Sequence, residues 1–334
     1  MQIAHRRLGE IGPEISVVGL GCNNFSRKGT ATETLEGTRA VIDAAVDAGI
    51  TFFDTAEMYG NPPGTSETLM GEALKAHDRE KVVIATKFGH QQVHTHGADV
   101  WGPKGGRTYI RNALEGSLRR LQTDYVDLFQ MHNPDPDVPI AETLFALNEL
   151  IDEGKVRHIG HTTFSTEQLV EANEIAESHG LRPFTSAQNE YSLLVRDAET
   201  GVLPEVLRAG MGFLPFFPLA NGLLTGKYTE DHRPEGARLT TLRPEALDAA
   251  NWEQLQEFQK LCDEVGLTML QATFGWLLAR EGLTSVIAGA TRPEQVRDNA
   301  QAGTVELEHE VIAAIEDIFP IVGREKAPVP TPAR

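Results

Sequence analysis

Four polar side chains follow short apolar segments, and their types suit the delivery of a proton to a carbonyl oxygen. Asp54 and Tyr59 lie in FDTAEMYG, Lys87 in ATKFG and His132 in LFQMH. A phenol has a pKa of about 10, so it releases its proton slowly at neutral pH. A nearby ammonium lowers that pKa, and a carboxylate holds the ammonium charged and oriented. An imidazole beside the phenol can relay a proton or fix the carbonyl oxygen.

Three of these four residues also have an ordinary structural explanation. Asp54, which precedes Thr55, could simply cap a turn. A single Lys after a strand is usually solvated, and a single His more often packs in a core than takes part in chemistry. We therefore base the prediction of a catalytic site on their joint placement at one end of the fold.

The elements before these residues must bring them together, and the chain alternates short β-like segments with longer amphipathic stretches. Eight such strands predict a (β/α)8 barrel, with a doubly wound open sheet as the main competitor. In a barrel, functional side chains gather at the C-terminal ends of the strands. The predicted strands are Ser16–Gly19, Thr51–Asp54, Val82–Thr86, Val126–Met131, His158–Thr162, Thr185–Asn189, Phe213–Phe217 and Ser285–Ala288. Predicted helices include Leu35–Ala48, Thr65–Ala76, Thr108–Leu121, Ile140–Glu153 and Thr166–Ser178.

Three kinds of segment fall outside this alternation. Arg6–Glu14 (RRLGEIGPE) carries Gly and Pro turn signals and predicts a hairpin that caps the bottom of the barrel. Asn221–Asn251 is a long polar connection after the seventh strand, and such loops are often functional. Two extra helices are expected, near Trp252–Val265 and Glu308–Ile318.

The composition excludes several classes of partner and of protein. The 334 residues carry 30 Lys and Arg against 48 Asp and Glu, a net charge of −18. This balance argues against nucleic acid and against anionic lipid as partners. Two distant cysteines, Cys22 and Cys262, form no disulfide framework, and we find no signal peptide or membrane span. We expect a cytoplasmic protein with one barrel domain over residues 1–325 and a Pro-rich flexible tail over 326–334.

The sequence resembles the aldo-keto reductase superfamily over nearly its whole length. The matching stretches, in the order of the family, are RRLGEIGPEISVVGLG, FFDTAEMYG, ATKFG, DYVDLFQMH, ELIDEGKVRHIG, AQNEYSLL, PLANGLLTGKY and GATRPEQVRDNA. The resemblance implies a (β/α)8 barrel that reversibly reduces aldehydes or ketones with NAD(P)H. It implies Tyr59 as the proton donor, Asp54 and Lys87 as the pair that lowers its pKa, and His132 as the orienting group.

The resemblance also implies a nicotinamide cofactor site. Gln188 would bond the carboxamide, Phe216 stands where a Tyr usually stacks on the ring, and Lys227 could pair with phosphate. Arg292 precedes a helix start and favours NADPH through the 2′-phosphate. Gln295 stands where many NADPH-preferring members carry Arg, so NADH is an alternative cofactor. The expected cofactor residues are Gly21, Cys22, Asp54, Thr162, Thr163, Gln188, Phe216, Pro218, Leu219, Gly222, Lys227, Gly289, Thr291, Arg292, Gln295 and Asn299.

For the carbonyl substrate, the only partner expected, we predict a largely apolar mouth that suits compounds with an apolar or mixed body. A sugar carbonyl is an alternative, and the oligomeric state is left open. The predicted pocket residues are Met58, Phe88, Trp101, His132, Asn133, Phe164 and Phe216.

Two other functions are compatible with parts of the sequence. Some members of the superfamily, such as potassium-channel β subunits, bind cofactor and act mainly through partners. His94 and His96 have the spacing of two metal ligands on a strand, as in metal-dependent hydrolase barrels. Their surrounding, GHQQVHTHGADVWG, reads as a loop with chance histidines, so no metal is expected. Gly19–Gly21 lacks the third glycine of a dinucleotide-binding fingerprint, which excludes that motif.

Overall fold

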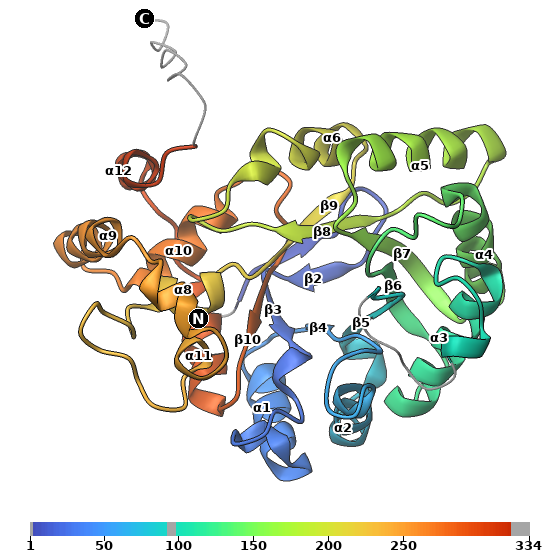
Figure 1. Cartoon of the computed structure of the whole chain (residues 1–334), viewed down its shortest axis with the longest axis horizontal. Helices are drawn as coiled ribbons and strands as arrows, with labels where there is room; N and C mark the ends of the chain where they lie inside the picture. The colour runs from blue at the N-terminus through green and yellow to red at the C-terminus, as the bar shows by residue number, and fades with distance from the viewer. Residues whose placement is uncertain (1–2, 92–97, 322–334) are drawn as a thin grey trace, which may run out of the picture.

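Eight parallel strands form the centre of the molecule in the computed structural model, which describes residues 3–91 and 98–321. Their order in the sheet is β10-β3-β4-β5-β6-β7-β8-β9. The two ends of this order also meet, because Phe213 bridges in parallel to Leu283 just before β10. The structure is therefore a (β/α)8 barrel (Figure 1). The strands are β3 (Val18–Gly21), β4 (Phe52–Asp54), β5 (Val83–Phe88), β6 (Val126–Met131), β7 (Val156–Thr162), β8 (Ser186–Glu190), β9 (Gly212–Phe216) and β10 (Val286–Gly289).

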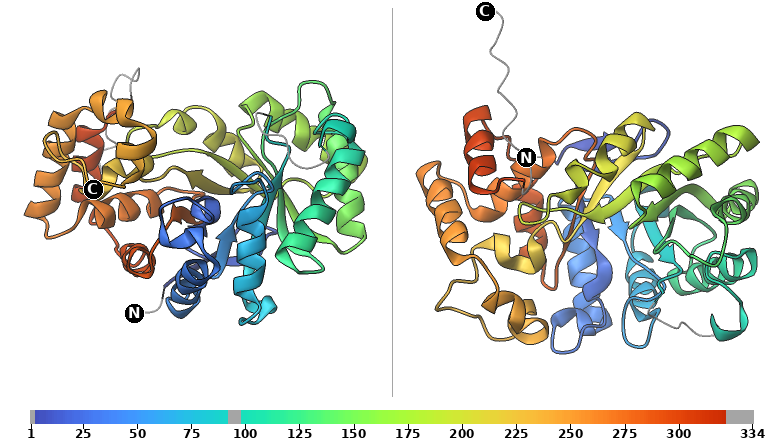
Figure 2. Two further views of the ribbon diagram at one scale, coloured as in Figure 1. Left: turned by 60° about the horizontal axis from the view of Figure 1, so that its bottom comes forward. Right: turned by 45° about the horizontal axis from the view of Figure 1, so that its top comes forward.

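Helices follow the strands and surround them on the outside (Figure 2). The sequence sets several of their ends. Ser165 and Gln168 form a capping box at the start of one helix, which ends at Gly180 in a left-handed conformation. The helices around the barrel are α1 (Leu35–Asp47), α2 (Thr65–Leu74), α3 (Arg107–Leu121), α4 (Ile140–Asp152), α5 (Thr166–His179), α6 (Val202–Arg208), α10 (Met269–Leu278) and α11 (Pro293–Ala302). The additional helices are α7 (Arg238–Leu242), α8 (Pro244–Asp248), α9 (Trp252–Glu264) and α12 (His309–Ile318).

A hairpin of β1 (His5–Arg7) and β2 (Glu14–Ser16) closes the N-terminal end of the barrel, which confirms the predicted cap. Its tip is fastened to the barrel wall, because Glu10 N donates to the carbonyl oxygen of Gly210 at 2.8 Å. Side chains of the hairpin enter the space between the strands and pack there with apolar residues of five strands. This inner cluster consists of Leu8, Ile15, Phe52, Ala85, Leu128, Leu214 and Ile287.

The first barrel strand begins two residues later than the sequence indicates. Ser16 belongs to the hairpin, where it pairs with His5, and β3 starts only at Val18. Hairpin and barrel strands follow each other without a loop, so an unbroken apolar run does not reveal where one ends. The long connection after β9 contains a short 3-10 segment, Ala220–Thr225, followed by α7 and α8.

No helix in the described part of the chain is long and apolar enough to cross a membrane. The predicted tail, residues 326–334, lies outside the described residues, so the division into barrel and tail stays a prediction.

Candidate active site

Three neighbouring strands carry the four predicted catalytic residues to one end of the barrel. Asp54 is the last residue of β4, Lys87 lies near the end of β5, and His132 directly follows β6. Tyr59 stands in the loop after β4. The backbone N–H of His132 donates to the carbonyl oxygen of Phe88 at 2.7 Å, which continues the strand pairing into the site. The parallel register therefore brings the four side chains together.

A buried ion pair forms the base of this site. Lys87, which is 0% exposed, donates from Nζ to Asp54 Oδ2 at 2.6 Å and to Tyr59 OH at 3.4 Å. The other Asp54 oxygen, Oδ1, accepts from the amides of Gln130 and Gln188, each at 3.2 Å. Asp54 is thus held from both sides, and the ammonium is directed at the phenol oxygen.

The local electrostatics keep both Lys87 and Tyr59 protonated. Burial alone would lower the pKa of Lys87, but Asp54 and Tyr59 raise it more, so the ammonium stays charged. Burial raises the pKa of Tyr59 above its usual value, and the Lys87 ammonium opposes this rise without cancelling it. Lys87 therefore acts on the pKa of Tyr59 in the expected direction, whereas Asp54 raises this pKa instead of lowering it. The phenol is fully protonated at neutral pH and can act as a proton donor.

The imidazole of His132 lies beside the phenol in its neutral form. The two rings meet edge to face with their centroids 5.9 Å apart. Burial lowers the pKa of His132 well below its usual value, and Lys87 and His90 lower it further. Its buried Nδ1 has no hydrogen-bond partner among the described residues. A neutral imidazole and a protonated phenol can both bond the oxygen of an entering carbonyl group.

Asp54, Tyr59 and His132 line a cavity of about 1230 Å³ at the C-terminal ends of the strands. Nearly all of the predicted cofactor residues line it. Cys22 is the exception: it is fully buried, and its Sγ faces the carbonyl oxygen of Leu20. The predicted residues on the cavity wall are Gly21, Asp54, Thr162, Thr163, Gln188, Phe216, Pro218, Leu219, Gly222, Lys227, Gly289, Thr291, Arg292, Gln295 and Asn299.

Five cationic side chains also line this cavity, although the protein has a net charge of −18. Across the described ranges, none of the five lies within ion-pairing distance of a carboxylate. Burial lowers the pKa of Lys227, and neighbouring guanidinium groups lower it further. Such mutual repulsion is relieved when an anion binds between the cations. We call these residues the cationic wall: Arg27, Lys227, Arg238, Arg243 and Arg292.

Sequence reasoning missed three residues of this wall. Arg27 follows β3, whereas Arg238 and Arg243 lie in the long connection after β9. The two arginines of the connection stand over the ring of Phe217, with guanidinium carbons 5.4 and 6.0 Å from its centroid. The length and the arginines of this connection were the available signal, but only the closed barrel brings it opposite Arg27.

At the end of β10, the start of α11 offers a second feature for an anion. Arg292 is the N-cap residue and Pro293 occupies the first turn, as the sequence predicts. Gln295 accepts through Oε1 from the backbone N–H of Thr291 at 2.8 Å. Gln295 therefore orders the turn before the helix, and Arg292 stands beside the free N–H groups of the first turn.

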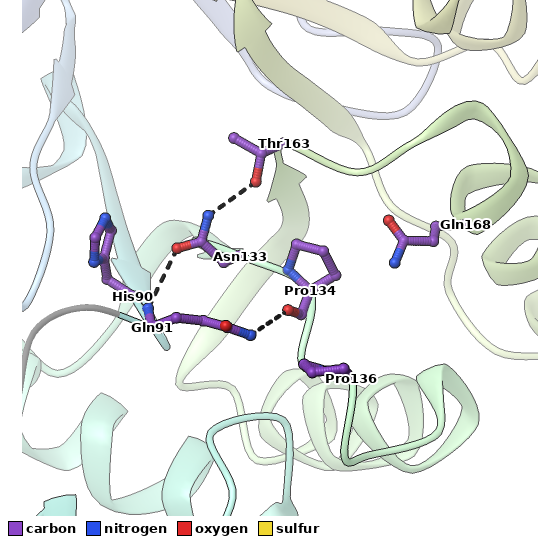
Figure 3. Close-up of a pocket in the computed structure, with 7 residues that line it drawn as sticks. All are labelled: His90, Gln91, Asn133, Pro134, Pro136, Thr163 and Gln168. Atoms are coloured by element: carbon purple, nitrogen blue, oxygen red, sulfur yellow. Dashed lines mark hydrogen bonds between the residues drawn. The ribbon is translucent and has the colours of Figure 1, made fainter.

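A smaller cavity of about 560 Å³ adjoins the large one and shares His90, Asn133 and Thr163 with it (Figure 3). Asn133 joins its two sides: Nδ2 donates to Thr163 Oγ1 at 3.0 Å, and Oδ1 accepts from Gln91 N at 3.3 Å. The amide of Gln168 is directed toward this space from α5 (Figure 3). Its lining is rich in amides; the remaining residues are Pro134 and Pro136.

The structure places only part of the predicted substrate pocket at these cavities. Met58, His132, Asn133 and Phe216 line the large cavity. The other three pack elsewhere. Phe88 lies on Phe129, Phe164 lies on His161, and Trp101 meets Tyr109 edge to face.

Alternation along a strand explains one of these cases. Lys87 points into the barrel, so the next residue, Phe88, must point out toward the helices. The mouth is accordingly less apolar than the sequence suggests. His94 and His96 lie outside the described residues. Among the residues described, no group of three or more His, Cys, Asp or Glu could hold a metal ion.

Known proteins resemble this chain over most of its length. The model of the aldo/keto reductase family matches residues 17–319. The L-glyceraldehyde 3-phosphate reductase of Escherichia coli O157:H7 is 35% identical over 90% of this chain and 88% of its own length. The uncharacterized oxidoreductase YrpG of Bacillus subtilis is 37% identical over 95% and 96%. A putative voltage-gated potassium channel subunit beta of Schizosaccharomyces pombe is 34% identical over 95% and 93%. The chain therefore belongs to the aldo/keto reductase family, a family of oxidoreductases.

Proposed function

We propose that this protein reduces aldehydes or ketones to alcohols with NADPH, and that Tyr59 supplies the proton. The observation that carries this proposal is the buried contact between Lys87 and Tyr59, with His132 at its side, at the floor of the large cavity. A protonated phenol next to a fixed ammonium is an acid whose conjugate base is stabilised as it forms.

The residues of the chain divide the chemistry among them. The neutral His132 and the Tyr59 hydroxyl hold the carbonyl oxygen between them. As negative charge develops on that oxygen, Tyr59 transfers its proton, and Lys87 stabilises the phenolate that results. Asp54 keeps the ammonium charged and in place. In the reverse direction the phenolate accepts the proton of the alcohol.

The large cavity fits a phosphorylated nicotinamide cofactor, which would supply the hydride. Gln188 and Phe216 line its inner part, where the amide and the aromatic face suit a nicotinamide. The cationic wall and the start of α11 suit phosphate groups. If Arg292 holds the 2′-phosphate, Arg292→Ala will raise the dissociation constant of NADPH more than that of NADH. Equal weakening of both would remove Arg292 from that role.

The amide-rich small cavity supports a polar, uncharged body for the substrate. Its described lining contains no Lys or Arg, and the pKa of His90 is lowered by burial and by Lys104, so that ring is neutral. One relative is named for a phosphorylated aldehyde. For this chain we expect hydroxylated aldehydes to be preferred over their phosphate esters.

A pair of aldehydes of different length separates binding of the substrate body in the small cavity from binding of the aldehyde group near His132. Gln168→Leu should raise the KM for a long polyhydroxylated aldehyde and leave a short aldehyde, which ends near His132, unchanged. Steady-state rates with both substrates measure this. An unchanged KM for the long aldehyde would place its body elsewhere.

Tyr59→Phe tests the reductase itself. The variant should bind NADPH as the wild type does, because it keeps the aromatic ring and all five residues of the cationic wall. It should lose about 10²–10⁴-fold in kcat with every carbonyl compound. Loss of nicotinamide absorbance measures kcat, and fluorescence titration measures binding. Turnover that survives the change would disprove the role of Tyr59.

A second candidate is a cofactor-binding regulatory subunit, which the potassium-channel relative raises. Single-turnover oxidation of bound NADPH by a broad panel of aldehydes distinguishes the two. Tight NADPH binding without oxidation by any aldehyde would favour the regulatory role.

A further inference from the structure

Glu57 is a buried carboxyl that the steps above do not use. It lies two residues before Tyr59 and is 2% exposed. Its Oε1 accepts two hydrogen bonds at 2.8 Å, one from the backbone N–H of Gly89 and one from the hydroxyl of Tyr109 in α3. It therefore links the loop of Tyr59 to the end of β5 and to a helix outside the barrel.

The bond to Gly89 prolongs the pairing of two strands beyond their ends. After β4 has ended, Thr55 N still donates to the carbonyl oxygen of Ala85 at 2.9 Å, and Glu57 N donates to that of Lys87 at 3.0 Å. The next N–H in this series would be that of Gly89, which turns away with φ +79°. This N–H donates to the side chain of Glu57 instead of to a backbone carbonyl oxygen.

Burying the Glu57 carboxyl group costs free energy, and its hydrogen bonds offset part of that cost. Burial raises the pKa of Glu57 to about 7, although the bonds from Gly89 and Tyr109 oppose the rise. The same bonds are stronger when the carboxyl is ionised, because charge-assisted hydrogen bonds exceed neutral ones. The other charged groups that act on this carboxyl or are acted on by it are Glu67, Arg120 and Lys104.

We propose that Glu57 is a positioning residue for proton transfer: it fixes the loop of Tyr59 against β5 and so sets the distance between the Tyr59 hydroxyl and Lys87 Nζ. This inference rests on the proposed function. It assigns to Glu57 no contact with substrate or cofactor. The consequence is that Glu57 acts on kcat and leaves the cationic wall, and hence cofactor affinity, unaffected.

Two substitutions separate the hydrogen bonds from the charge. Glu57→Gln keeps an oxygen that can accept both bonds, so kcat should stay within about 3-fold of wild type. Glu57→Ala removes both bonds, and a misplacement of the phenol of up to 1 Å lowers kcat by about 100-fold. Tyr109→Phe removes one donor and should fall between them. The NADPH dissociation constant should be unchanged in all three.

The pH profile gives a readout that simple destabilisation would not produce. As the pH rises through about 7, the carboxyl loses its proton and its bonds tighten, so wild-type kcat should rise across that range. Glu57→Gln cannot ionise, so its profile should lack this rise. If Glu57→Ala fails to fold, the comparison of wild type with Glu57→Gln decides the question.

Two results would overturn the proposal: full kcat in folded Glu57→Ala, or the same pH profile in wild type and Glu57→Gln. Tyr59→Phe, run in the same assay, keeps the two levels apart. If Tyr59→Phe still turns over, the proposed reduction mechanism fails. If it is inactive while Glu57→Ala is fully active, only the positioning role fails.

Discussion

Residue type alone does not set the chemistry of the polar groups in this barrel; burial and partners do. Lys87 stays charged without solvent because Asp54 lies 2.6 Å away, and Tyr59 stays protonated because burial outweighs that ammonium. His161 shows the effect of burial on protonation when no hydrogen-bond partner is present. It is 0% exposed, and in the described structure neither ring nitrogen has a hydrogen-bond partner. Burial lowers its pKa to about 3.

His161 therefore makes stability depend on pH. The folded protein keeps this ring neutral, whereas an unfolded chain takes up a proton below a pKa of about 6.5. Its contribution is complete above that pH and is lost at up to about 1.4 kcal/mol per pH unit as the pH falls from 6.5 toward 3. His161→Leu should flatten this part of the profile, as measured by urea unfolding at several pH values. The exposed His309→Gln serves as control; an equally steep profile in His161→Leu would contradict the prediction.

At the scale of elements, the two ends of the barrel have separate tasks. The C-terminal ends of the strands and their loops hold the four candidate catalytic groups and the cavities. The N-terminal hairpin fills the opposite end, where Leu8 and Ile15 pack into the inner cluster. Parallel strands can build a site at one end because all of them finish there. The opposite end serves stability.

The hairpin allows this division to be tested. Leu8→Ala removes a fully buried side chain and should lower the free energy of unfolding by about 2–5 kcal/mol. Ile11 lies in the same hairpin but is 52% exposed, so Ile11→Ala should change it by less than about 0.5 kcal/mol. Urea unfolding measures both. The folded Leu8→Ala protein should keep its kcat, and a large loss of kcat would show that the two ends are coupled.

Over the whole molecule, a net charge of −18 surrounds a cavity with five cations. An anionic cofactor is therefore repelled by the protein as a whole and attracted by the cavity. Three segments that are distant in the chain create this local reversal of sign, since Arg27 follows β3, Arg238 follows β9 and Arg292 follows β10. Close contacts in a partly enclosed cavity are less screened than the long-range repulsion, so attraction dominates for a bound anion.

Salt should reveal how many charges are engaged. Raising NaCl from about 0.05 M to about 0.5 M screens these contacts, so the NADPH dissociation constant should rise. NADH lacks the 2′-phosphate and should respond less. Arg292→Ala should bring the NADPH response close to that of NADH. Fluorescence titration at several salt concentrations measures all three, and equal responses of NADPH and NADH in the wild type would contradict the prediction.

The sequence by itself determined the alternation of strands and helices, the hairpin cap and the placement of the four catalytic candidates at strand ends. These follow from local periodicity, turn residues and the rule that parallel strands end together. The tertiary structure decided the rest. Only strand closure brings Arg27 opposite Arg238, and only alternation in β5 turns Phe88 away from the cavity. Burial, opposed by partners distant in the chain, raises the pKa values of Tyr59 and Glu57. Closure and burial depend on residues far apart in the chain, which local patterns do not contain.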